Sequence, residues 1–113
     1  MTQETRVFKL LSDPNRIAIF MLLMDDEYCV CDIERLLNMK QSNVSKHLMA
    51  FKKLSLLECR KHSTWNHYRL SKSSLSELRE LCDYLRKSSS YIELQKSLRS
   101  FEKSVCGTEG EMT

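Results

Sequence analysis

Residues 30–54, VCDIERLLNMKQSNVSKHLMAFKKL, carry the clearest structural pattern in this chain of 113 residues. Apolar side chains recur at the spacing of one helix face over 30–37 and again over 41–54. The three residues between these stretches, 38–40, are enough for a short turn. Two short helices joined in this way form a helix-turn-helix, a motif whose second helix lies in the major groove of DNA. The side chains expected to be buried are Val30, Ile33, Leu36, Leu37, Val44, Leu48, Phe51 and Leu54.

Downstream, the segment LECRKHSTWNHYRL at 57–70 lacks a helical stripe and is rich in aromatic and polar side chains. Such a segment suits two strands joined around Ser63 and Thr64, so we predict a β-hairpin, the wing of a winged helix-turn-helix. After Ser71 the apolar spacing becomes helical again. The three serines at 88–90 are expected to divide this last part into two helices.

Upstream, Asp13 and Pro14 form a strong helix start, because aspartate is a preferred N-cap and proline suits the first helical position. An earlier helix is expected to end at Ser12. The chain has only two glycines and one proline, and both glycines lie near its C-terminus. We therefore predict a mainly α fold with a small β-hairpin, in which C-terminal helices follow the wing.

The length of the chain indicates one domain. We expect residues 1–106 to form it, with the helix-turn-helix at about 30–54, the wing at about 57–70 and a flexible tail at 107–113. The sequence has no run of 18 apolar residues, and its N-terminus lacks the apolar stretch of a signal peptide. A cytoplasmic protein that does not enter a membrane is expected.

The net charge of +3 is unevenly distributed along the chain. Residues 1–33 carry a net −3, residues 34–69 a net +6, and residues 70–113 a net charge of zero. A basic block between acidic and neutral flanks indicates a local surface that binds a polyanion such as DNA. Amide, hydroxyl and cationic side chains gather on the solvent side of the second helix and around the hairpin. The candidate DNA contacts are Gln41, Ser42, Asn43, Ser45, Lys46, His47, Lys52, Lys53, Arg60, Lys61, His62 and Thr64.

The stretches DPNRIAIFMLL, EYCVCDIERLL, QSNVSKHLMAFKKLSLLECRK and WNHYRLS follow one another over roughly residues 5–85. Together they resemble the winged helix-turn-helix repressors of the ArsR/SmtB family, and CVCD resembles its arsenic-sensing branch. The resemblance implies a homodimer, built by pairing the first and C-terminal helices of two chains, that represses metal or metalloid resistance genes. It also implies that the dimer leaves its operator when the ligand binds. Two-fold symmetry then predicts an inverted-repeat operator.

The chain has five cysteines, Cys29, Cys31, Cys59, Cys82 and Cys106, and this odd number without an export signal indicates reduced thiols. Soft thiolates such as those of Cys29 and Cys31 select soft ions. Residues two apart in a helix point in nearly opposite directions, so one ion can bind both sulfur atoms only if the first helical turn distorts or begins after Cys29. We predict that this strain tilts or stiffens the DNA-reading helix. Cys59 and Cys82 are expected in core or interface positions.

Several features bear on the ion that the two thiols select. Four carboxylates between positions 25 and 32 would attract Cd(II) or Pb(II), whereas arsenous acid is neutral near pH 7. By resemblance, however, cadmium and lead sensors take further cysteines from an N-terminal extension, and residues 1–28 contain none. Zinc sensors use histidines on the C-terminal helix, and no histidine follows position 67. We therefore predict As(III) or Sb(III) as the inducer, with Cd(II), Pb(II) or Zn(II) as alternatives.

The sequence departs from the family pattern at three points. Glu34 stands where some arsenic sensors carry a third cysteine, so either two thiols suffice or Cys106 supplies another. Lys40 stands where a serine often caps the DNA-reading helix, and this cap is lost unless Asn38 or Ser42 supplies it. The hairpin lacks the glycine that is common in the wings of the family.

Two other mechanisms use the same cysteines. One is a redox or sulfide switch in the same fold, which would close a disulfide using Cys29, Cys31 or Cys82. The other is a small thiol enzyme such as an arsenate reductase. An enzyme is not expected, because no thiol lies in an anion-binding loop and no general base accompanies one.

Overall fold

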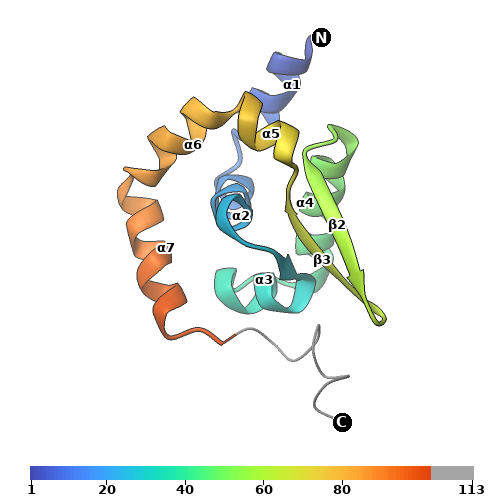
Figure 1. Ribbon diagram of the computed structural model, residues 1–113, viewed down its shortest axis with the longest axis vertical. Coiled ribbons are helices and arrows are strands. Elements are labelled where there is room, and N and C mark those ends of the chain that lie inside the picture. Colours follow the sequence, from blue (N-terminus) through green and yellow to red (C-terminus); the bar gives the residue numbers. More distant parts are fainter. Residues whose placement is uncertain (103–113) are drawn as a thin grey trace.

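The computed structural model describes residues 1–102, which confirm the predicted fold class (Figure 1). The predicted tail at 107–113 and Cys106 lie outside the described residues. No helix in the described range is both long enough and apolar enough to cross a bilayer. The helices are α1 (Gln3–Leu10), α2 (Pro14–Asp25), α3 (Val30–Leu37), α4 (Gln41–Lys53), α5 (Lys72–Glu77), α6 (Arg79–Arg86) and α7 (Ser89–Arg99). The strands are β1 (Tyr28–Cys29), β2 (Leu57–His62) and β3 (Trp65–Leu70).

Helix α2 forms the centre of the molecule, and the other helices lie around it (Figure 1). It begins as predicted, because the Asp13 carboxylate accepts hydrogen bonds from the backbone N–H groups of Asn15, at 2.7 Å, and Arg16, at 3.3 Å. Every side chain over 19–24 is buried. Burial of a large apolar side chain contributes roughly 1.5–3 kcal/mol, so α2 is the support against which the other elements are positioned.

The structure contains the predicted helix-turn-helix. Its two helices, α3 and α4, begin and end close to the expected residues. Asn38 ends α3 in the left-handed conformation, with φ 52°, which asparagine tolerates better than most residues. Ile33, Val44 and Phe51 are fully buried at 0% exposure, and Leu48 is buried beside them. The remaining predicted core positions are half-buried, namely Val30, Leu36, Leu37 and Leu54.

The wing consists of β2 and β3, joined at Ser63 and Thr64 as predicted. Ser63 adopts φ 60° at the tip, a left-handed conformation that is supplied here without glycine. The sheet has a further strand that the sequence did not predict. β1 pairs antiparallel with β3, so that Cys29 lies opposite His67 and the strand order is β1-β3-β2. This short strand joins the start of α3 directly to the wing.

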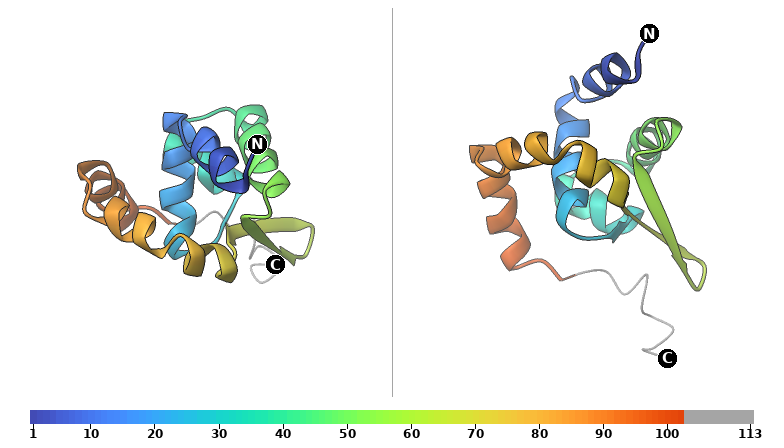
Figure 2. Two further views of the ribbon diagram at one scale, coloured as in Figure 1. Left: turned by 90° about the horizontal axis from the view of Figure 1, so that it is seen from above. Right: turned by 45° about the horizontal axis from the view of Figure 1, so that its top comes forward.

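The C-terminal part is divided where predicted and at one further point. Ser88 caps α7, because its Oγ accepts a hydrogen bond from the N–H of Tyr91 at 3.2 Å. A second break at Leu78 separates α5 from α6. Arg86 Nη2 donates to the Asp25 carboxylate at 2.8 Å, and the Tyr91 hydroxyl donates to the same carboxylate. These contacts fasten α6 and α7 to the end of α2, around which they curve in Figure 2.

The two cysteines expected in core or interface positions differ. Cys82 is buried at 2% exposure, and this burial raises the pKa of its thiol. Cys59 is exposed on β2, so the core half of the prediction is wrong for this residue, and an interface position stays a prediction. Residues 58–61 of β2 are all exposed, so both faces of this part of the strand lie at the surface.

Candidate nucleic-acid interface and thiol pair

The first turns of α4 present the side chains that were predicted to read DNA. Gln41, Ser42, Asn43 and Lys46 are exposed, and Ser45 is half-buried. They point outward because the apolar stripe of α4 fixes the opposite face against the core. The helix contains no acidic residue. Amide, hydroxyl and ammonium groups on one helix face can reach both base edges and phosphates.

His47 is less well suited to a phosphate contact than its neighbours. Its side chain is half-buried. Burial lowers the pKa of the imidazole, and nearby Arg16 lowers it further, although Asp13 opposes the shift. A lowered pKa leaves less positive charge on the imidazole to attract a phosphate. The structure therefore adds nothing in favour of the prediction that His47 contacts DNA.

The C-terminal half of α4 faces two different neighbours. Lys52 and Lys53 are both exposed. The Nζ atom of Lys52 lies 5.8 Å from the centre of the Tyr68 ring on β3, so this lysine is on the wing side. Lys53 instead borders a groove that α4 shares with α1. The helix therefore lies between the wing and α1.

The predicted wing contacts lie in different environments. Lys61 and Thr64 are exposed near the tip, and the half-buried His62 ring meets the His67 ring edge-on at 6.4 Å. Arg60 has a specific partner, because its Nε and Nη2 atoms donate to Glu27 Oε2 at 3.0 and 2.6 Å. A bidentate pair of this kind fixes the orientation of the guanidinium. Arg60 thus ties β2 to the residue that precedes β1.

Glu27 and β1 are the parts of this region that sequence reasoning missed. Glu27 and Arg60 lie 33 positions apart, so no periodic pattern connects them. The two-residue strand is too short to show an alternation of polar and apolar side chains. One signal in the sequence could have suggested this ion pair. The segment before Cys29 is acidic and the hairpin has an excess of basic residues, so the two segments have opposite charge.

Helix α4 begins without a side-chain cap. Lys40 occupies the N-cap position and makes no capping hydrogen bond, and within residues 1–102 neither Asn38 nor Ser42 supplies one. The loss that the sequence indicated is therefore not compensated. The N–H groups of Asn43 and Val44 donate to the Lys40 carbonyl oxygen, so those of Gln41 and Ser42 are the ones at this helix start that could face an anion.

Cys29 and Cys31 lie on either side of the start of α3. Cys29 is the last residue of β1 and the N-cap position of α3, with an extended backbone (φ −84°, ψ 169°) and 2% exposure. Cys31 lies in the first turn and is half-buried. The helix thus begins after Cys29, which is one of the two conditions under which a single ion can bind both sulfur atoms.

The thiol pair has acidic surroundings. Burial, together with the negative charges of Asp26, Asp32 and Asp25, raises the pKa of Tyr28 to about 12. Asp32 is only 1% exposed, and its Oδ1 atom lies 3.7 Å from Arg35 Nη1. Negative charge of this density favours cations at this corner of the molecule.

The described residues do not supply a third thiol ligand beside Cys29 and Cys31. Residues 1–102 contain no group of three or more His, Cys, Asp or Glu side chains arranged to hold a metal ion. Cys106, the predicted third ligand, lies outside the described residues. Phe101 lies beneath Arg35 of α3, with the guanidinium carbon 4.8 Å from the ring centre. The described part of the chain therefore ends beside the helix that carries Cys31.

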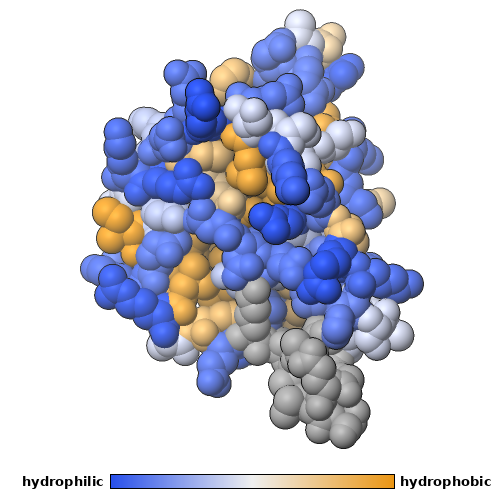
Figure 3. All heavy atoms as spheres, in the orientation of Figure 1, coloured by the Kyte–Doolittle hydropathy of each residue, from blue (hydrophilic) through white to orange (hydrophobic). Residues whose placement is uncertain are grey.

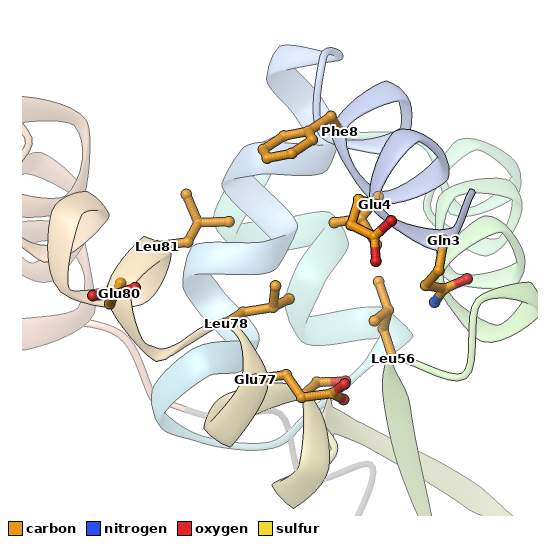
Figure 4. A pocket seen from close by; sticks show the side chains of 10 residues that line it. Gln3, Glu4, Phe8, Leu56, Glu77, Leu78, Glu80 and Leu81 are labelled. Carbon is orange, nitrogen blue, oxygen red and sulfur yellow. The ribbon is translucent and has the colours of Figure 1, made fainter. Parts of the chain in front are cut away.

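An apolar groove of about 400 Å³ lies between α1 and the α5–α6 segment. Figure 4 shows Phe8, Leu78 and Leu81 around its opening, with Leu56 deeper and the carboxylates of α1, α5 and α6 at its rim. Phe8 is 68% exposed, which is unusual for phenylalanine. In Figure 3, apolar side chains reach the surface in the region where these helices meet. An exposed apolar surface of this kind marks an interaction site.

The sequence is similar to several characterised regulators. The family model described as "Bacterial regulatory protein, arsR family" matches residues 13–58. The arsenical resistance operon repressor of Escherichia coli is 42% identical over 67 residues, covering 58% of this chain and 57% of that protein. The repressor of the same description from Bacillus subtilis is 32% identical, covering 71% of this chain and 79% of that protein. The cadmium resistance regulator CadC of Listeria innocua is 36% identical, covering 66% of this chain and 63% of CadC.

Solved structures agree with these relationships. HlyU from Vibrio cholerae matches with a TM-score of 0.67 at 25% identity, covering 75% of this chain and 89% of HlyU. The homodimeric winged helix-turn-helix DNA-binding domain of Mb0332 from Mycobacterium bovis matches with a TM-score of 0.61 at 27% identity, covering 77% of this chain and 85% of that domain. The chain spans little more than half of the E. coli repressor but most of the B. subtilis one. It belongs to the arsR family of bacterial regulatory proteins.

Proposed function

We propose that this protein is a transcriptional repressor that binds operator DNA as a homodimer and is released when As(III) or Sb(III) binds Cys29 and Cys31. The observation that carries the proposal is the position of Cys29. It ends β1, which pairs with the wing strand β3, and it immediately precedes α3 of the helix-turn-helix. A ligand bound here acts on both elements that would touch DNA.

DNA recognition relies on α4 and the wing. The exposed amides and hydroxyls of Gln41, Ser42 and Asn43 read base edges in the major groove, and Lys46 and Lys52 hold phosphates. Lys61 and Thr64 at the wing tip contact the backbone or the adjacent minor groove. The protein acts in the cytoplasm, where operator DNA lies.

The homodimer forms through the apolar groove between α1 and the α5–α6 segment. Phe8, Leu78 and Leu81 present apolar surface there that a second copy of the chain would cover. The similar domain from M. bovis is homodimeric. Two-fold symmetry presents two copies of α4 to the DNA, so the operator is an inverted repeat with half-sites about one helical turn or more apart.

Ligand and DNA are coupled through the short strand β1. Drawing the sulfur atoms of Cys29 and Cys31 onto one ion changes the backbone at the junction of β1 and α3. That change moves α3 against α4, and it pulls on the wing through the pairing of Cys29 with His67 and through the ion pair of Glu27 with Arg60. Both DNA-binding elements then leave the arrangement that fits the groove.

The third ligand is Cys106 or is not required. Cys31 and Arg35 lie one helical turn apart on α3, and Arg35 contacts Phe101 near the end of the described residues. Trivalent arsenic binds two or three thiolates, which suits either case.

A cadmium or lead sensor is the second candidate, and a specific observation favours it. The charges of Asp25, Asp26 and Asp32 contribute to the raised pKa of Tyr28, the residue next to Cys29. This charge attracts a divalent cation and does nothing for neutral arsenous acid. CadC, at 36% identity, is described as a cadmium resistance regulator.

Fluorescence anisotropy on a labelled duplex from the protein's own promoter tests the proposal. Arsenite, antimonite, Cd(II), Pb(II) and Zn(II) are titrated separately into the complex under reducing conditions. Release by arsenite or antimonite supports the proposal, and release by Cd(II) or Pb(II) alone supports the second candidate. A duplex that the protein does not bind, or from which no ion releases it, contradicts both.

A further inference from the structure

A second groove lies beside α4, on the side away from the wing. It is shallow, and residues of α1 and α4, both basic and apolar, line it. Arg6 and Lys9 line it from α1, and Lys46 and Lys53 line it from α4. Arg16, at the start of α2, closes one end. These five cations come from three helices that are separated in sequence, so no local run of basic residues reveals the cluster.

The charges of this groove are almost unopposed. Its lining contains no aspartate or glutamate. Arg16 has a carboxylate partner, Asp13, at 3.9 Å. Within residues 1–102, no ion pair joins Arg6, Lys9 or Lys53 to an acidic side chain, and all three are exposed. A surface that carries one sign of charge attracts a polyanion.

The two faces of α1 differ in chemistry. Arg6 and Lys9, three residues apart, lie on the side that faces α4. Glu4 and Phe8 lie on the other side, which faces the apolar groove. The dimer interface of the proposed function therefore leaves the basic side of α1 uncovered.

Two hydrogen bonds connect α1 to its neighbours. Gln3 Nε2 donates to the carbonyl oxygen of Leu54 at 3.3 Å, which fastens the start of α1 to the end of α4. Arg16 Nη1 donates to the carbonyl oxygen of Leu10 at 3.2 Å, which fastens the end of α1 to α2. In Figure 1, α1 projects from the body of the molecule at the end where α2 begins. These bonds place the backbone of α1 next to the end of α4.

We infer that the groove between α1 and α4 is a second DNA-backbone contact, in which Arg6, Lys9 and Lys53 hold phosphates. The inference rests on the proposed function, because it requires α4 to lie in a major groove. That groove is about 12 Å wide in B-DNA, and a phosphate strand runs along each side of it. Lys52, beside Tyr68 of the wing, faces one of these strands. The cations of α1 face the other.

The occupant is DNA rather than another polyanion because the basic surface is continuous. Lys46 belongs both to the exposed reading face of α4 and to the lining of the α1 groove. A duplex seated on α4 therefore passes over Lys46 before it reaches Arg6 and Lys9. Phosphate contacts position a protein on DNA without reading sequence, so these residues raise affinity for all duplexes alike.

The test measures operator affinity by anisotropy across a series of salt concentrations. The variant carries Arg6→Gln and Lys9→Gln, and the matched control carries Lys87→Gln and Lys96→Gln on exposed parts of the C-terminal helices. Each phosphate contact contributes about 0.9 to the slope of log K against log salt. A dimer that loses four contacts is expected to show a slope smaller by up to about 3.6. Operator and unrelated duplexes should lose affinity in the same proportion, and the control should keep the wild-type slope.

A charge-retaining variant, Arg6→Lys with Lys9→Arg, guards against an effect on folding or dimerisation, and it should keep the wild-type slope. Size-exclusion chromatography verifies the oligomeric state of each protein. If the glutamine variant remains dimeric and its slope equals that of the control, the inference is overturned while the proposed function stands. If the wild-type chain does not bind its promoter duplex at all, the proposed function fails, and the inference fails with it.

Discussion

The helices of the scaffold and the two helices of the helix-turn-helix begin in different ways. At the starts of α1, α2, α5 and α7, a side-chain oxygen accepts a hydrogen bond from a backbone N–H group of the first turn. The capping side chains are Thr2, Asp13, Ser71 and Ser88. Helices α3 and α4 begin at Cys29 and Lys40, and neither of these side chains forms a capping hydrogen bond. Helix α6 follows α5 directly through Leu78.

The difference indicates how this molecule divides stability from function. A good N-cap is worth about 0.5–2 kcal/mol, so the scaffold helices use their first turns to hold the fold. The two helices of the helix-turn-helix, α3 and α4, both lack this stabilisation by a side-chain cap. In the proposed function, the start of α4 binds phosphate and the start of α3 carries a thiol that binds the ligand. A helix without a cap also deforms at a lower free-energy cost, which suits a sensor.

Replacing both thiols is expected to have the largest effect. In Cys29→Ser with Cys31→Ser, arsenite should no longer change operator affinity, whereas in the wild type it should weaken binding by about 5–150-fold, the usual range of allosteric coupling. Serine is a preferred N-cap residue, so the variant should fold and bind the operator without arsenite. Anisotropy with and without arsenite measures both effects. Cys59→Ser, at an exposed site on β2, is the control. An intact arsenite response in the double variant would place the sensor elsewhere.

Loss of the ion pair between Glu27 and Arg60 should have a smaller effect. Glu27→Gln removes the charge that Arg60 Nη2 approaches to 2.6 Å, so strain at the thiols reaches the wing less efficiently. We expect the arsenite-dependent change in operator affinity to shrink by about 2–30-fold, while arsenite binds the free protein as before. The matched control is Glu93→Gln, which removes an exposed ion pair to Lys96. A coupling equal to that of the control would mean that the wing is not part of the switch.

The smallest effects should come from exchanging the two kinds of helix start. Lys40→Ser gives α4 the cap it lacks and should raise the free energy of unfolding by about 1 kcal/mol. Ser88→Ala removes the cap of α7 and should lower it by about 0.5–2 kcal/mol. Urea denaturation at one fixed protein concentration measures both, because the stability of a dimer depends on concentration. If Lys40→Ser left the free energy of unfolding unchanged, the missing cap of α4 would not lower stability, and the contrast between the two kinds of helix start would lose its meaning.

Much of the fold could be predicted because its strongest signals are local. Apolar periodicity was sufficient to define α3 and α4, and Asp13 with Pro14 marked the start of α2. The outward positions of Gln41 and Asn43 follow from the same periodicity. The wing followed from the change in period after α4.

The features that sequence could not supply depend on tertiary contacts. Strand β1 forms only because β3 offers a partner, and its two residues carry no period of their own. The burial of Asp32 at 1% exposure contradicts the usual preference of aspartate for the surface. The groove between α1 and α4 gathers cations from distant parts of the chain, each of which reads as an ordinary surface residue. The break between α5 and α6 occurs at Leu78, a residue with no tendency to end a helix.

The central claim is that occupation of the thiols and binding of the operator exclude each other, and calorimetry tests it most directly. Arsenite is titrated into the free protein and, separately, into the protein saturated with operator duplex. Because coupling between two ligands is reciprocal, arsenite should bind the DNA complex more weakly by the same factor by which it weakens operator binding, about 5–150-fold. Equal arsenite affinities for the free and the DNA-bound protein would contradict the account.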